Sequence, residues 1–322
     1  MILVTGGAGY VGAVLSKRLH EAGRPVRVLD AMIHRQEHVA AELEGLGIHV
    51  LRGDVRNGAA RQQALTGVGA VVHLGAIVGD PACSRDPELS GAVNVEGTRS
   101  LLEDVHRLGV ERFVFASTCS NYGRMSDPDV PVDEESVLAP VSLYAEQKVA
   151  IERDLLGGRW NGVHACCLRF ATVYGVAPRM RFDLTVNEFT RELWAGNELL
   201  VFGEQFWRPY IHVNDVAAAV SLVLGEPVDR IGGNVYNVGS SDENYRKVDI
   251  VEIVKALVPR GSVSFVRRDE DPRDYRVNFD KIARDLGFNP TMSVADGVRE
   301  IATALDETAF DDPFAARYTN TP

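Results

Sequence analysis

The chain has 322 residues, a net charge of −11 at pH 7, 45% hydrophobic residues and 25% charged residues. This length suggests one large domain or two modest ones, and the acidic excess argues against nucleic acid or an anionic membrane as a partner. No apolar run approaches the ~18 residues of a transmembrane helix, and the first residues lack a signal-peptide pattern. The four cysteines have no metal-site spacing, so we expect reduced thiols, no metal and a cytoplasmic protein.

A glycine-rich turn between two apolar runs opens the chain. Met1–Val4 is long enough for one buried strand, and Thr5–Gly12 follows with Gly-x-x-Gly-x-x-Gly spacing. A helical pattern over 11–22 ends at Gly23, and a second strand, Val26–Asp30, ends in an acid. Strand, glycine turn, helix, strand and acid together form the dinucleotide-binding fingerprint in the context that it requires.

Each residue of this fingerprint has a physical role. Gly6 can take the tight turn, Gly9 lets the backbone approach a pyrophosphate, and Gly12 lets helix and strand pack closely. The helix N-terminus offers N–H groups and a positive dipole end to the phosphates. Asp30 would accept hydrogen bonds from the ribose hydroxyls and repel a 2′-phosphate, which favours NAD. Arg35 is near enough in sequence to keep NADP open.

Strand and helix patterns continue to alternate through the first half. We expect strands at 48–51, 70–76, 112–118 and 163–170 and helices at 89–108 and 141–156. This alternation predicts a doubly wound α/β fold of Rossmann type, with a parallel sheet covered on both faces. Ligands of such sheets bind at the C-terminal ends of the strands.

The second half is less regular. We expect helices at 184–195, 248–257 and 295–305, strands at 199–202, 234–238 and 263–266, and a strand at 210–213 that returns to the sheet with its following helix. The predicted organisation is an NAD-binding domain at 1–176, with 209–240 returning to it in part, and a smaller α/β substrate domain at 177–322. The polar tail at 311–322 is expected to be frayed.

Tyr144 and Lys148 lie at i and i+4, on one face of a predicted helix. A tyrosine phenol is a poor base at neutral pH, but a nearby lysine ammonium would favour the phenolate. Such a pair is common by chance. Here it follows a predicted dinucleotide fold and a hydroxyl-bearing strand end at Ser117–Ser120, and this context indicates catalysis rather than an ordinary surface pair.

A series of motifs in a fixed order then resembles the extended short-chain dehydrogenase/reductase superfamily, in its NAD-dependent nucleotide-sugar epimerase/dehydratase branch typified by UDP-glucose 4-epimerase. The resemblance runs from Met1 to about Leu305 and includes the Tyr144/Lys148 pair. Its other motifs are Thr-Gly-Gly-Ala-Gly-Tyr-Val-Gly from Thr5, Gly-Asp-Val from Gly53, His-Leu-Gly-Ala from His73, Asn-Val-Glu-Gly-Thr from Asn94, Ser-Thr-Cys-Ser-Asn-Tyr-Gly from Ser117, Leu-Arg-Phe-Ala-Thr-Val-Tyr-Gly from Leu168 and Trp-Arg-Pro-Tyr-Ile-His-Val from Trp207.

The resemblance implies that Tyr144 is the general base and acid, that Lys148 is its partner and that Thr118 binds the reacting sugar hydroxyl. It implies cofactor contacts from Gly6, Gly9, Tyr10, Val11, Gly12, Asp30, Asp54, Val55, Leu74, Gly75, Ala76, Asn94, Ser117, Tyr144 and Lys148. It implies contacts to a nucleoside-diphosphate sugar from Thr118, Cys119, Ser120, Thr172, Asn187, Arg208 and Arg268. Guanidinium groups bind diphosphates bidentately, although Arg208 could instead pair with an acid such as Asp215. Arg179, Arg181 and Arg273 are weaker candidates, and His73, His164 and His212 are expected to be structural.

Departures from the family pattern separate the possible reactions. The 4,6-dehydratases typically carry Asp-Glu after the strand-end threonine, where this chain has Cys119 and Ser120, and Thr172 replaces a usual Asn. The leading prediction is an NAD-dependent nucleotide-sugar epimerase that acts at C4 through a transient 4-keto sugar. The alternatives are an NAD(P)H-dependent 4-ketoreductase of deoxysugar biosynthesis and a non-catalytic NAD-sensing protein. The resemblance also implies a homodimer that pairs the helix of Tyr144 with the helix before it.

Overall fold

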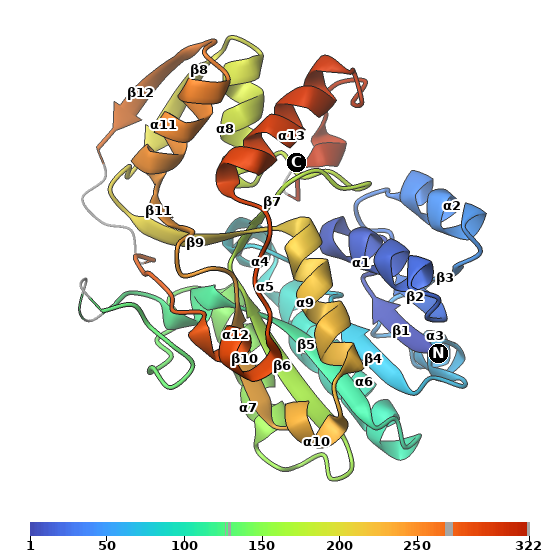
Figure 1. Cartoon of the computed structure of the whole chain (residues 1–322). Helices are drawn as coiled ribbons and strands as arrows, with labels where there is room; N and C mark the ends of the chain where they lie inside the picture. The colour runs from blue at the N-terminus through green and yellow to red at the C-terminus, as the bar shows by residue number, and fades with distance from the viewer. Residues whose placement is uncertain (126, 128–129, 268–272, 321–322) are drawn as a thin grey trace. The chain divides into compact units, whose positions relative to one another are not determined.

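The computed structural model describes residues 1–125, 127, 130–267 and 273–320 (Figure 1). The chain forms two compact units, each assembled from separate segments. The first unit comprises Met1–Thr118, Ser142–Arg169 and Ala217–Tyr236, and the second comprises Cys119–Val141, Phe170–Val216 and Asn237–Pro322. Within the described residues, no helix is both long enough and apolar enough to cross a membrane.

A seven-stranded sheet organises the first unit, and the doubly wound α/β prediction is confirmed. The strand order is β10-β6-β5-β4-β1-β2-β3, and β1 pairs in parallel with both β2 and β4. The strand order therefore reverses direction at the β1/β4 pair, which is where such sheets bind ligands. The strands are β1 (Ile2–Thr5), β2 (Val26–Asp30), β3 (His49–Arg52), β4 (Ala70–His73), β5 (Arg112–Thr118), β6 (His164–Phe170) and β10 (Asn234–Val238).

Helices connect these strands and cover the sheet. On one face, Leu3, Val71 and Phe113 of the strands pack with Leu101 of α6 and Ile151 of α7 in a single buried core. The predicted helix at 89–108 is present, but its middle is a π-helical turn, η1 (Ala92–Gly97). The helices are α1 (Tyr10–Glu21), α2 (Glu37–Gly45), α3 (Gly58–Leu65), α4 (Asp80–Arg85), α5 (Pro87–Gly91), α6 (Thr98–Arg107), α7 (Leu143–Leu156), α9 (Val213–Gly225) and α10 (Val228–Ile231).

The second unit contains two small sheets. One has the order β11-β9-β7 and the other pairs β12 with β8. The expectation that 210–213 returns to the large sheet is therefore wrong, because β9 pairs in parallel with β7 and antiparallel with β11. The elements are β7 (Thr172–Tyr174), β8 (Glu198–Phe202), β9 (Trp207–His212), β11 (Asn244–Arg246), β12 (Ser262–Val266), α8 (Thr185–Trp194), α11 (Lys247–Leu257), α12 (Asp280–Leu286), α13 (Val294–Asp306) and the 3₁₀ turns η2 (Cys119–Tyr122) and η3 (Ala316–Tyr318).

The segment after β5 belongs to the second unit, whereas the sequence placed all of 1–176 in the NAD-binding domain. The reason is backbone pairing: Arg124 bridges to Asp274 and Val132 bridges to Val277. The Glu134 carboxylate also accepts the N–H of Asn237 at 2.7 Å. These partners lie more than a hundred residues away along the chain, so local patterns could not reveal them.

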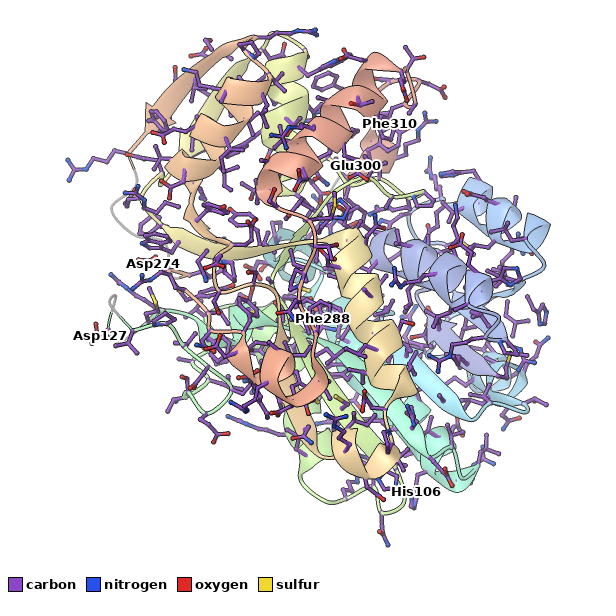
Figure 2. The ribbon with its side chains drawn as sticks, in the orientation of Figure 1. His106, Asp127, Asp274, Phe288, Glu300 and Phe310 are labelled. Atoms are coloured by element: carbon purple, nitrogen blue, oxygen red, sulfur yellow. The ribbon has the colours of Figure 1, made fainter. Side chains whose placement is uncertain are left out.

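The tail after α13 is packed rather than frayed up to the last described residue, Asn320. Tyr318 is buried and forms edge contacts with Phe182 and with Phe310, which Figure 2 labels. The N–H of Asn320 donates to Asp183 at 3.1 Å. The expectation of a frayed tail is wrong for 311–320, because Phe310 and Tyr318, eight residues apart, share one apolar cluster with Phe182.

Candidate active site

The glycine turn at the end of β1 leaves no room for side chains. Gly6 has φ +68°, and a Cβ on it would lie 2.8 Å from Cα of Gly75. A Cβ on Gly12 would lie 2.1 Å from the carbonyl oxygen of Gly6. The N–H of Gly9 donates to that same oxygen at 3.1 Å, and α1 begins at the next residue. The result is a bare backbone surface at a helix N-terminus, as a pyrophosphate requires.

Asp30, at the end of β2, is buried with its carboxylate fixed against this turn. The N–H of Ala8 donates to Oδ2 at 3.0 Å. The N–H of Met32 and the side-chain amide of Gln36 donate to Oδ1 at 2.9 and 3.1 Å. The carboxylate is thus oriented before any cofactor arrives. The sequence singled out Asp30 but missed Gln36, because a glutamine in an irregular loop carries no pattern.

Asp54 and Val55 follow β3. The Arg56 guanidinium binds the Asp54 carboxylate, with Nη2 at 2.6 Å from Oδ2, and these hydrogen bonds hold the pKa of the carboxyl below its usual value. Both side chains of this pair are partly exposed, so its stabilising contribution is small. Val55 is buried in the core under the sheet. An adenine contact by this pair stays a prediction.

A buried chain of hydrogen bonds lies below the end of β4. The Thr98 hydroxyl donates to the carbonyl of Asn94, so it accepts from His73 Nε2 at 2.9 Å, and Nδ1 accepts from the Thr5 hydroxyl at 2.6 Å. Burial, with the charge of Lys148 nearby, lowers the pKa of His73 to about 3. His73 is therefore a neutral structural histidine, as predicted. The Thr5 oxygen also accepts the N–H of Gly75, which fixes the loop that begins at Leu74.

Asn94 sits in the π-helical turn, and its side chain anchors the same loop. Oδ1 accepts the N–H of Ile77 at 2.8 Å, and Nδ2 donates to the carbonyl of Ile77 at 3.0 Å. Nδ2 also donates to Gln147 of α7 at 2.8 Å, and Gln147 donates to Ser90. The cofactor contact of Asn94 stays a prediction. The structure shows a second role that the sequence did not suggest, because Asn94 connects the loop after β4 to α7.

Helix α7 carries the predicted catalytic pair. It begins after Ser142, whose hydroxyl accepts the N–H of Ala145. Lys148 is buried; its Nζ donates to the carbonyl of Ala116 at 2.7 Å and lies 5.8 Å from the centre of the Tyr144 ring. Burial lowers the pKa of Lys148 to about 8. The ammonium thus stands beside the Tyr144 ring and the end of β5, where Ser117 and Thr118 lie.

One further turn along α7, Glu152 forms a buried ion pair that the sequence analysis missed. Both oxygens of Glu152 accept from Arg169 of β6, with Nη2 at 2.7 Å from Oε2. Only 2% of Glu152 and 4% of Arg169 is exposed. Residues 144, 148 and 152 are spaced by four, so a helix-face count could have found Glu152. The pair fixes α7 against β6 and places a carboxylate one turn from Lys148.

In the second unit, Arg208 and Ser120 contact the same tyrosine. The Ser120 hydroxyl lies 3.3 Å from the hydroxyl of Tyr275, and the Arg208 guanidinium lies over the Tyr275 ring at 5.4 Å. Arg208 is buried and donates to the carbonyl of Trp207 at 2.6 Å. Cys119 is also buried. Tyr275 is itself buried, and this burial raises the pKa of its hydroxyl. Tyr275 was not singled out, because its nearest sequence neighbours give no pattern.

The other substrate candidates of this unit have local roles. Asn187 accepts the N–H of Gly175 at 3.0 Å and donates to the carbonyl of Arg181 at 2.8 Å, so it fixes the loop after β7, the strand that starts at Thr172. Asp215 accepts from Thr291 and Met292. Two of the weaker arginine candidates also contact protein groups: Arg179 donates to Thr319 and Arg181 pairs with Asp183.

Other predicted residues need only a short statement. Arg268 lies outside the described residues. His212 is buried and structural, as expected: its Nε2 lies 2.8 Å from Glu300 of α13, which Figure 2 labels, and its Nδ1 accepts from Asn214. The four cysteines are buried free thiols. Among the described residues, no group of three or more histidine, cysteine, aspartate or glutamate side chains is placed to hold a metal ion.

The model of the NAD dependent epimerase/dehydratase family matches residues 2–239 of the chain. The chain belongs to the NAD-dependent epimerase/dehydratase family. It is therefore an NAD-dependent enzyme of the extended short-chain dehydrogenase type, and the predicted family, enzyme class and cofactor are confirmed.

Relatives in this family are named for different reactions. A dTDP-glucose 4,6-dehydratase of Streptomyces niveus is 31% identical, over 93% of this chain and 90% of its own length. A UDP-glucose 4-epimerase of Streptomyces lividans is 30% identical, over 90% of this chain and 92% of its own. The comparison supports nucleotide-sugar chemistry but does not settle which reaction the chain performs.

Solved structures of the family superpose well. The UDP-glucose 4-epimerase of Thermotoga maritima with UDP-glucose has a TM-score of 0.85 and 25% identity, covering 96% of this chain and 99% of that chain. The UDP-glucuronic acid 4-epimerase of Bacillus cereus, in complex with UDP-glucuronic acid and NAD, has a TM-score of 0.84 and 25% identity, covering 95% and 99%.

The first unit fits the family's cofactor on its own geometry. A Cβ at Gly6 or Gly12 would collide with backbone, so these positions keep the turn bare for a pyrophosphate. Asp30 presents a fixed carboxylate at the end of β2. All the candidate cofactor residues, with Thr118, belong to the first unit. The other substrate candidates that are described, Cys119, Ser120, Thr172, Asn187 and Arg208, belong to the second.

Proposed function

We propose that the protein is an NAD-dependent nucleotide-sugar 4-epimerase that works through a transient 4-keto sugar. The observation that carries this proposal is the Tyr144/Lys148 pair on α7, with Lys148 buried and held by the carbonyl of Ala116. Thr118 is followed by Cys119 and Ser120, which supply no carboxylate pair for eliminating water. The site therefore has the groups for moving one proton at a sugar hydroxyl and lacks the dehydratase pair.

In this reaction, Tyr144 removes the proton from the C4 hydroxyl and later returns it to the same oxygen. Bound NAD supplies reversible acceptance of the C4 hydride. Thr118 orients the hydroxyl by a hydrogen bond, and the Lys148 ammonium stabilises negative charge on the Tyr144 oxygen. Rotation of the keto sugar between the two half-reactions inverts C4. Arg208 is proposed to bind the diphosphate of the substrate, because a guanidinium can bind phosphate through two hydrogen bonds.

The test begins with the purified protein as it comes from expression. Mass spectrometry of small molecules released by acid is expected to find NAD⁺ or NADH near one per chain. The protein is then incubated with UDP-glucose, UDP-glucuronate and dTDP-glucose, because relatives or structural neighbours are named for each of these sugars. Proton NMR is expected to show a C4 epimer of at least one. A 4-keto-6-deoxy product from dTDP-glucose, or no turnover of any sugar, would contradict the proposal.

The alternative is a 4-ketoreductase, which needs the same Thr118, Tyr144 and Lys148 but exchanges its cofactor in each cycle. Stoichiometric oxidation of added NADH or NADPH by a 4-keto sugar would establish it. The relation between cofactor and product thus separates the two reactions, because an epimerase needs no external reductant.

We also propose that the protein is a cytoplasmic homodimer. The cytoplasmic location rests on the four cysteines, which are expected to be reduced thiols. The homodimer rests on the family resemblance, which implies that the helix of Tyr144 pairs with the helix before it across a two-fold axis. Light scattering at working concentration is expected to give twice the monomer mass of 35.2 kDa, and a value near that mass would contradict it.

A further inference from the structure

The loop between β2 and α2 has an unusual backbone. Met32 and Arg35 have φ of +54° and +56°, in the left-handed region that non-glycine residues seldom adopt. The N–H of Arg35 donates to the carbonyl of Met32 at 3.0 Å, which closes a tight turn between them. Two such residues within four positions cost free energy, so something must hold the loop in this form.

Gln36 is the side chain that joins the parts of this loop. It is 2% exposed and lies directly before α2. Its Nε2 donates to Asp30 Oδ1 at 3.1 Å, and its Oε1 accepts the N–H of His34 at 2.9 Å. Its backbone carbonyl accepts from Val39 in the first turn of α2. One buried amide therefore ties the end of β2, the middle of the loop and the start of the helix.

The consequence for Asp30 is a fixed carboxylate. Turning it away would break the bonds from Ala8, Met32 and Gln36, each to a buried charged acceptor. A 2′-phosphate carries a charge of about −1.5 to −2 near neutral pH, so it could bind only if this carboxylate moved or a cation came close. The adjacent Arg35 is exposed, but its backbone is committed to the closed turn.

We propose that Gln36 is a cofactor-selectivity residue: it holds Asp30 toward the cofactor ribose and keeps Arg35 in the closed turn, so that the protein accepts NAD and rejects NADP. This inference rests on the proposed cofactor site at the glycine turn and Asp30. It adds a residue that acts through Asp30, and so a positioning residue rather than a ligand of the cofactor.

The test compares the two cofactors directly. Wild type and Gln36→Leu are stripped of bound cofactor, and thermal unfolding checks that each stripped protein is folded. The affinities for NAD⁺ and NADP⁺ are then measured by calorimetric titration. Leucine is close in size to glutamine but makes neither hydrogen bond. The expected result is a fall of at least about tenfold in the NAD⁺/NADP⁺ affinity ratio, because Asp30 and the loop are released. Equal losses for both cofactors, or no change in the ratio, would overturn the proposal.

Two further variants keep the result interpretable. Asn237→Leu removes another buried amide, one that lies in the second unit, and it is expected to leave the ratio within about threefold of wild type. Gln36→Asn retains an amide that is one methylene too short to span both partners, and it replaces Gln36→Leu if that variant fails to fold. A ratio that changes as much in Asn237→Leu as in the Gln36 variants would mean a general loss of packing and would overturn the role of Gln36.

The double variant Gln36→Leu/Arg35→Gly tests how NADP⁺ gains entry. Glycine tolerates the positive φ of position 35 and removes the guanidinium. If release of the loop lets Arg35 bind the 2′-phosphate, the double variant is expected to lose most of the gain in NADP⁺ affinity. A wild type that binds neither cofactor would contradict the proposed cofactor site itself, whereas NAD⁺ binding with an unchanged ratio contradicts only the role of Gln36.

Discussion

The two units of the molecule hold their candidate sites by different means. In the first unit, contacts run between short motifs, such as Gly6 against Gly75 and the chain from Thr5 through His73 to Thr98. In the second unit, the corresponding contacts join side chains that have no motif of their own, such as Ser120 and Tyr275, which are 155 residues apart. Local sequence patterns can predict a site built from strand ends and tight turns, but they cannot predict a site built from loops that pair across long stretches of the chain.

Removing the Tyr144 hydroxyl should have the largest effect. Tyr144→Phe is expected to lower kcat by about 10³-fold, because no other group replaces the acid and base at the sugar oxygen. NAD content and thermal stability should stay as in wild type. The assay is C4 epimerisation of whichever nucleotide sugar the wild type turns over.

The matched control lies in the second unit. Tyr174→Phe also removes a tyrosine hydroxyl, in this case a buried one that donates to the carbonyl of Met292 at 3.1 Å. It is expected to cost about 1 kcal/mol of stability and to change kcat by less than about threefold. Equal activity in Tyr144→Phe and wild type would show that Tyr144 is not the acid and base of the reaction.

The buried ammonium of Lys148 should make stability depend on pH. Its pKa is lowered from 10.5 to about 8 in the folded protein. Above pH 8 the folded chain loses this proton while the unfolded chain keeps it to higher pH, so the free energy of unfolding should rise with pH by about 3 kcal/mol across this window.

Lys148→Met isolates this contribution from other groups that titrate at high pH. Urea unfolding of both proteins between about pH 7 and about pH 10 should show a rise in wild type that the variant lacks. Parallel curves would mean that Lys148 is not desolvated as the structure describes. The charged form is thus held at a cost to stability, as expected for a group that stabilises charge on Tyr144.

Filling the glycine turn should damage the first unit alone. In Gly12→Ala the new Cβ would lie 2.1 Å from the carbonyl oxygen of Gly6. We expect the free energy of unfolding to fall by about 2 kcal/mol and bound NAD to be lost. Gly45→Ala, in α2, has nothing within 4 Å of its Cβ and should be neutral or stabilising by up to about 1 kcal/mol. Retained NAD in Gly12→Ala would show that the turn does not hold the cofactor.

The same difference explains what could be predicted from the sequence. The strands from β1 to β6, the start of α1 and the Tyr144/Lys148 face follow from hydrophobic period, glycine spacing and helix geometry, and they appear within a few residues of their expected ends. Gln36 and Tyr275 were missed because each gains its role from a fold that brings distant or irregular segments together. The tail was misjudged for the same reason, since Tyr318 packs not only against the nearby Phe310 but also against Phe182, which is distant in the sequence.

The smallest effect should come from Arg208, and it tests whether the second unit recognises the substrate. Arg208→Lys keeps the charge but loses the planar fork, so KM for the nucleotide sugar should rise about tenfold with kcat nearly unchanged. Arg246→Lys is the control. Arg246, on β11, lies near Trp207, the residue before Arg208 on β9, but it is exposed and pairs with Asp249. Its KM should change by less than about twofold, because exposed ion pairs contribute little. If the two variants shift KM equally, Arg208 acts only through the packing of β9, and substrate recognition must be sought elsewhere in the unit.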